Sequence, residues 1–132
     1  MSDFSVYSAG EVVSWLSQGT VDTAPDPIFV TLFDDTGAEL DGSLQNGRVS
    51  TTAGTDWDVV NTSFENAIEI DFGDATADIT VQDVALYDSD TGGSNNELAR
   101  YTIQSAPRNI SSGTRVFFPA SQLSFDVVDR TQ

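Results

Sequence analysis

The sequence predicts an all-β protein: an antiparallel two-sheet sandwich or jelly roll of seven to eight strands with a short N-terminal helix. Short apolar segments recur from Thr23 onward, and several of them alternate apolar with polar residues. Clusters of Gly, Pro, Asn and Asp separate these segments, as turns separate strands. Two packed sheets are the expected architecture for such a pattern, and a closed barrel is the alternative.

The first twenty residues differ from the rest. Ser8 and Glu11 form a capping-box pattern, and Gly19 is typical of a helix end. We therefore expect an amphipathic helix over residues 8–18, with Val12, Trp15 and Leu16 as an assembly anchor. So short a helix is marginal alone, and its apolar stripe must dock on the chain's own body or on a neighbouring subunit.

The chain is accordingly expected to comprise an anchoring segment, residues 1–22, and a β-sandwich domain, residues 23–132. Pro25 and Pro27 precede the first expected strand, residues 28–33. Turn signals follow it, and a short polar strand is expected after the third of them. These turns lie at residues 34–37, 41–42 and 46–47, and the polar strand at residues 48–52.

The clearest alternation lies at residues 67–72. Its two isoleucines and Phe72 are expected on one face and its carboxylates on the other, as in a half-buried antiparallel strand. The next strand, residues 79–87, changes its apolar phase near Gln82, which indicates a β-bulge. The last three expected strands are residues 98–104, 115–118 and 123–127.

The charge of the chain is strongly unbalanced. Asp and Glu number 21, Arg numbers five, and Lys is absent, so the formal net charge is -16 over 132 residues. At low salt such a surface repels itself. At molar salt the Debye length falls to ~3 Å, and the carboxylates become screened, hydrated solubility groups. A protein of an extreme halophile, or of one of its viruses, is therefore expected, synthesised in a host cytoplasm at high salt.

Composition also excludes several functions. The chain has no Cys and no His, so thiolate chemistry, disulfides and the commonest zinc ligand are excluded. No Lys or His is present to activate a nucleophile, and we expect no enzyme activity. Nucleic-acid binding is disfavoured by the charge. Neither a signal peptide nor a membrane-inserted segment is expected.

Two weaker candidate sites remain. Asp88, Asp90, Asn96 and Glu97 flank a polar loop and offer oxygen ligands of the kind that Ca²⁺ or Mg²⁺ takes, although a polar hairpin turn is the simpler interpretation. Trp57 is flanked by two aspartates in a stretch that is neither a clean helix nor a clean strand. It is either a glycan contact or an aromatic residue that closes one end of the core.

A series of short motifs runs along the chain: residues 30–35, 39–42, Arg48, Trp57, Asn66, residues 70–73, 84–88, 92–93 and 113–120. In this order the motifs resemble those of small tail-fibre-like and minor virion proteins of tailed viruses. With the acidic composition, the resemblance implies a tailed virus of haloarchaea.

The resemblance implies a structural protein on the outer surface of the virion, in a tail appendage or a capsid projection such as a turret. It also implies oligomers on the exterior of the particle. We expect a trimer or pentamer, contacts with other virion proteins, and contact with a host-surface glycan. The resemblance implies no catalytic residues at any position of this chain. A halophilic carbohydrate-binding module is the alternative function.

The charge generates a first prediction. We expect the unfolding midpoint to rise steeply between low salt and molar KCl, because screening removes the repulsion among carboxylates. Thermal unfolding followed by circular dichroism across that range measures it. A midpoint that is flat with salt would contradict the halophilic interpretation.

Overall fold

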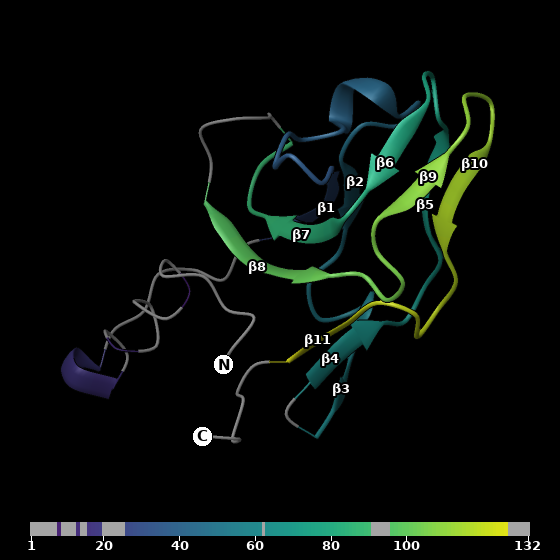
Figure 1. The fold of residues 1–132 in the computed structure, drawn as a ribbon. Helices are drawn as coiled ribbons and strands as arrows, with labels where there is room; N and C mark the ends of the chain where they lie inside the picture. The colour runs from purple at the N-terminus through teal and green to yellow at the C-terminus, as the bar shows by residue number, and fades with distance from the viewer. Residues whose placement is uncertain are drawn as a thin grey trace.

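The fold is taken from a computed structural model that describes residues 8, 13, 16–19, 26–61, 63–90 and 96–126. Within these residues the chain forms eleven β-strands and the short 3-10 helix η1 (Asp41–Ser43). Every strand pair is antiparallel. The predicted all-β class is confirmed, and Figure 1 shows the strands arranged as layers around a common interior.

The largest sheet has four strands in the order β2–β1–β7–β8. Their bounds are Val49–Thr51 (β2), Ile28–Phe33 (β1), Asp83–Tyr87 (β7) and Glu97–Thr102 (β8). On its inner face Val30 lies opposite Leu86, and Leu32 lies opposite Val84. All four side chains are buried, which identifies this face as one wall of the core.

Two smaller sheets are the arms of one bent ribbon. The chain from 70 to 81 pairs antiparallel with the chain from 118 back to 108, first as β5 with β10 and then as β6 with β9. The bounds are Ile70–Asp74 (β5), Ile79–Val81 (β6), Arg108–Ile110 (β9) and Arg115–Phe118 (β10). Both arms contribute buried residues to the same core as the four-stranded sheet.

Between the arms, the two chains stay joined around a corner. The Ala75 N–H donates to the Thr114 carbonyl over 2.8 Å, and the Gly113 N–H donates to the Ala75 carbonyl over 2.7 Å. The Ser112 N–H donates to the Asp78 carboxylate over 2.8 Å. These bonds make the two chains bend together, so β9 and β10 diverge from the turn that connects them (Figure 1).

A third small sheet completes the domain, in the order β11–β4–β3. Its strands are Ser124–Asp126 (β11), Ser63–Asn66 (β4) and Trp57–Val60 (β3). The stacked rings of Phe64 and Phe125 lie 5.4 Å apart. Phe125 is fully buried and also meets Tyr101 of β8 edge-on at 4.9 Å, which joins this sheet to the four-stranded one.

The buried side chain of Asn66 connects this sheet to the ribbon. Its amide nitrogen donates to the carbonyls of Ile68 (2.7 Å) and Pro119 (2.9 Å), and its carbonyl oxygen accepts from the Leu123 N–H (2.9 Å). One fully buried amide therefore satisfies backbone groups in the two links that join this sheet to β5 and β10.

Several expected elements are confirmed and others are corrected. The strand expected at 28–33 is β1 and that at 115–118 is β10, with the same bounds. The strand expected at 79–87 is two strands, because Gln82 lies where the chain leaves the ribbon for the four-stranded sheet. The alternating stretch 67–72 becomes strand only from Ile70, and Ile68 is exposed rather than buried.

The strand count is higher than expected for a physical reason. The tryptophan stretch forms the hairpin β3–β4, and Arg108–Ile110 forms β9, although neither showed a clear apolar alternation. Their pairing partners, rather than their own side chains, define them as strands. The Asn46-Gly47 turn is present, with the Gly47 N–H donating to the Leu44 carbonyl, but it joins no β-hairpin.

Asn66→Ala is predicted to destabilise the domain by about 2–3 kcal/mol, because it leaves buried carbonyl and N–H groups without partners. Denaturant unfolding of the two proteins measures the difference. Asn109→Ala is the matched control, since that exposed side chain accepts one surface hydrogen bond, from Thr80. Equal midpoints for Asn66→Ala and Asn109→Ala would contradict the role of the buried amide.

Candidate functional site

The predicted anchor residues lie in the N-terminal segment. The structure describes Leu16, whose side chain is 73% exposed, whereas Val12 and Trp15 lie outside the described residues. Residues 8, 13 and 16–18 are helical, and Val13 is 62% exposed. The Ser8 hydroxyl donates to the carbonyl of Leu98 in β8 over 3.0 Å. The segment thus contacts the domain at β8 while two of its large apolar side chains remain in solvent.

The predicted metal loop closes through its own hydrogen bonds. Both oxygens of Asp88 accept from Asn96, one from the backbone N–H (3.2 Å) and one from the side-chain amide (3.0 Å). Glu97 instead accepts from Arg100 and from the Tyr87 hydroxyl. Asp90 is exposed. Across the described ranges no three acidic side chains gather as metal ligands, so a Ca²⁺ or Mg²⁺ site here stays a prediction.

Trp57 is half-buried beside the core. Its indole N–H donates to the Thr51 hydroxyl over 2.9 Å. Its ring meets Phe64 at 5.7 Å and Phe125 at 6.0 Å, both edge-on. This geometry is that of an aromatic residue closing the core, which is one of the two roles expected from the sequence. A glycan contact at Trp57 stays a prediction.

The outer face of the four-stranded sheet carries an arginine–aromatic cluster that the sequence did not predict. It comprises Phe33, Glu39, Arg48, Tyr87, Glu97 and Arg100. The Phe33 and Tyr87 rings are stacked with their centroids 6.2 Å apart. The Arg100 guanidinium carbon lies 3.8 Å from the Phe33 ring centroid, and that of Arg48 lies 4.2 Å from the Tyr87 centroid. Cation–π contacts therefore cover the Phe33 and Tyr87 rings of this face.

Arg48 is the most deeply buried charge of the cluster, with a side chain 1% exposed. It donates to both oxygens of Glu39, over 2.6 and 2.9 Å, and to the carbonyl of Ser89 over 2.7 Å. The Thr31 hydroxyl also donates to Glu39, over 2.6 Å. Arg48 thereby fastens the chain at Glu39 and the start of the 88–97 loop to one sheet face.

These contacts shift the acid–base behaviour of the cluster. Burial alone would raise the pKa of Glu39, but the hydrogen bonds from Arg48 and Thr31 outweigh it and hold that pKa below its ordinary 4.5. Burial and the neighbouring Glu97 carboxylate raise the pKa of the Tyr87 phenol. Glu39 is therefore ionised, and Tyr87 protonated, across the neutral range.

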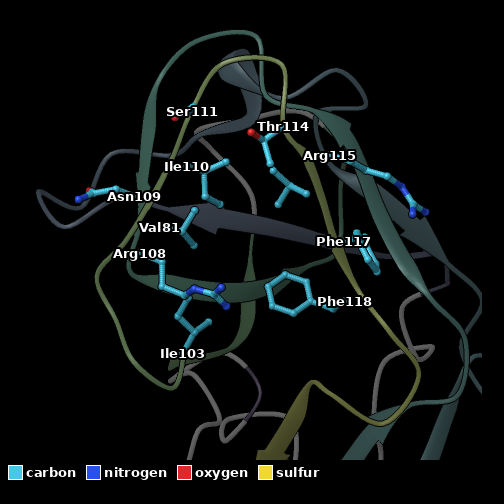
Figure 2. A pocket seen from close by; sticks show the side chains of 11 residues that line it. Val81, Ile103, Arg108, Asn109, Ile110, Ser111, Thr114, Arg115, Phe117 and Phe118 are labelled. Carbon is cyan, nitrogen blue, oxygen red and sulfur yellow. The ribbon is translucent and has the colours of Figure 1, made fainter.

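The second feature is a groove of about 510 Å³ between β9 and β10, which we call the ribbon groove. Its apolar lining comes from Val81, Ile103, Ile110, Val116 and Phe118, and its polar lining includes Arg108, Asn109 and Arg115. Figure 2 shows Ile103, Val81 and Ile110 on one side of the groove and Phe118 across from them. The groove exists because the two strands diverge at the corner of the ribbon.

The two arginines of the groove differ in their partners. Arg115 donates to Glu69 (2.6 Å) and Asp71 (2.9 Å), and its guanidinium carbon lies 4.2 Å from the Phe117 ring centroid. Arg108 is exposed and pairs with no carboxylate within the described part of the chain. The groove was not among the sites expected from the sequence. The sequence signal for it is the position of Arg108 and Arg115 on either side of the Ser111–Thr114 turn.

The Glu39 carboxylate generates a pH prediction. The pKa of Glu39 is lower in the folded protein than in the unfolded chain. The carboxylate therefore stabilises the fold fully at pH values above the unfolded-state pKa, and this stabilisation is lost as the pH falls through the folded-state pKa. At neutral pH, Glu39→Gln is expected to cost roughly 2–4 kcal/mol, because it leaves a buried guanidinium without its counterion.

The stability difference between wild type and Glu39→Gln should therefore shrink as the pH is lowered below about 4.5. Urea unfolding at a series of pH values measures it. Asp35→Asn, which removes the same charge from an exposed turn residue, is the control for general charge effects. A difference that does not change with pH would contradict the assignment.

No helix among the described residues is long and apolar enough to cross a membrane. The chain matches the sequence family described as Podophage GP4 fiber I protein gp80 over residues 3–126. A search of curated proteins found no match. The family match spans most of the N-terminal segment and nearly all of the β domain, and it supports a structural, virion-fibre role with an outer location and assembly with other proteins. The chain therefore belongs to the Podophage GP4 fiber I protein gp80 family.

Proposed function

We propose that the protein is an oligomeric subunit of a tail appendage, in which residues 1–22 join it to other subunits and the β domain is displayed outward. The observation that carries this proposal is the family match over residues 3–126, because it includes both parts in one unit. Of the two placements expected from the sequence, the family's fibre name favours a tail appendage over a capsid turret. A trimer or pentamer is the expected oligomer.

The exposed N-terminal side chains support an anchoring role. Val13 and Leu16 are 62% and 73% exposed, although a water-soluble helix normally covers its apolar stripe. The neighbouring Val12 and Trp15 add two more apolar side chains to the same short segment. Burial of such a stripe against another chain would remove apolar area from water and favour association.

The proposed host is a haloarchaeon, and the net charge of -16 supports this. Four of the five arginines are described, and three of those four already pair with carboxylates of the chain itself. The rest of the acidic surface is left to be neutralised by salt. Contact with a host-surface glycan through the exposed loops of the domain is part of the proposal.

Removal of residues 1–20 is predicted to abolish assembly. Native mass in molar KCl should change from an oligomer to a monomer, because the apolar anchor is lost. An unchanged unfolding midpoint would show that the remaining domain is still folded. An unchanged oligomer would overturn the anchoring role.

Leu16→Ser is a milder form of the same test, expected to weaken the oligomer. Val59→Ser is its matched control, since Val59 is 81% exposed and lies on β3 rather than in the anchor. Equal effects of the two substitutions on native mass would also contradict the proposal.

A further inference from the structure

We propose that the ribbon groove is the acceptor for the N-terminal segment, residues 1–22, of a second copy of this chain. The inference rests on the proposed function, which assigns assembly to that segment, and adds the surface that receives it. None of the described residues of the segment lines the groove, so each copy would offer one groove and one segment.

The shape and lining of the groove fit an apolar stripe. Its volume of about 510 Å³ is in the range of sites that enclose ligand groups, and apolar side chains such as Ile103, Ile110 and Phe118 line it. A short amphipathic helix that lays its apolar face into such a groove is a common mode of recognition. Val12, Trp15 and Leu16 supply that face.

The strands that border the groove are open on that side. β9 pairs with β6 and β10 pairs with β5, and among the described strands neither has a second neighbour. Exposed strand edges of this kind are usually covered by another element. The groove is therefore a place where the fold leaves strand edges, together with the half-buried side chains of Ile110 and Phe118, for a further segment.

The charge of the segment is opposite to that of Arg108 at the groove. Residues 1–22 contain three carboxylates, at Asp3, Glu11 and Asp22, and no arginine. Arg48, Arg100 and Arg115 already bind carboxylates of their own chain. Arg108, at the groove, is the described arginine that remains for a carboxylate from elsewhere. Two chains that each carry a net charge of -16 repel each other over most of their surfaces. An arginine without a carboxylate partner attracts carboxylates of the second chain and so favours contact at the groove.

The contact is assigned to a second copy rather than to the same chain. Val13 and Leu16 are in solvent, and no described residue of the N-terminal segment lines the groove. The segment instead contacts its own domain at β8, through Ser8 and Leu98.

The test is photo-crosslinking in the full-length protein. Ser17, an exposed residue beside the anchor, is replaced by p-benzoylphenylalanine, which leaves Val12, Trp15 and Leu16 in place. The protein is mixed with ¹⁵N-labelled copies in molar KCl and irradiated, and the linked peptides are identified by mass spectrometry. We expect crosslinks between light and heavy copies within residues 103–118. Crosslinks confined to one copy, or to other strands such as β3 and β4, would overturn the inference.

A charge variant supplies the second measurement. Arg108→Gln is expected to weaken the oligomer roughly fivefold at the lowest salt at which the protein stays folded, and less in molar salt. Thr76→Glu makes the net charge one unit more negative as well, on an exposed residue that does not line the groove, and should leave the oligomer unchanged. Equal effects of the two variants on the oligomer would contradict the binding of a carboxylate from the second copy to Arg108.

The two proposals fail in different ways. A full-length protein that stays monomeric at every salt concentration would overturn the proposed assembly. The other case is an oligomer that is lost on removal of residues 1–20 but gives crosslinks outside the groove. That result would support the anchoring role of the segment and contradict the groove as its binding site.

Discussion

The bend in the ribbon is the constraint on which the rest of the structure depends. If residues 70–81 and 108–118 paired without a corner, they would form one long flat hairpin, which could not enclose a core. The hydrogen bonds around Ala75 and Gly113 keep the chains together while they turn, so both arms bury their apolar residues against the four-stranded sheet. The same turn separates β9 from β10. Core formation and an open groove are thus two results of one bend.

Positive charge is scarce in this chain, and two of the described arginines lie on one sheet face. Arg48 and Arg100 lie over Tyr87 and Phe33, so two cations shield an aromatic face that would otherwise contact water. The planar guanidinium of Arg48 holds Glu39 through two bonds and Ser89 through a third, which the single ammonium of a lysine could not reproduce. The absence of lysine from the sequence therefore agrees with the way in which the structure uses its cations. Loop attachment and shielding of the sheet are achieved with few positive charges.

The sequence was sufficient for those parts of the fold whose strands carry their own apolar signal, such as β1 and β10, and for the all-β class. It failed where pairing rather than composition makes the strand, as in β9, and where a single residue, Gln82, separates strands of different sheets. The arginine–aromatic cluster and the ribbon groove could not be predicted for the same reason. Each brings together residues far apart in the chain, such as Glu39 with Arg100 or Ile103 with Phe118. The periodicity of a short sequence segment does not indicate such long-range contacts.

If the N-terminal segment of one copy binds the ribbon groove of the next, as proposed above, a chain of subunits has a direction. An assembly built from unlike surfaces has one end with a vacant groove and another with an unused segment, unless it closes into a ring. The two ends are then chemically different. A virion protein that offers only a groove would bind one end and terminate growth there, whereas one that offers only an apolar acidic segment would bind the opposite end. The length and polarity of an appendage could thus be fixed by which capping protein occupies each end.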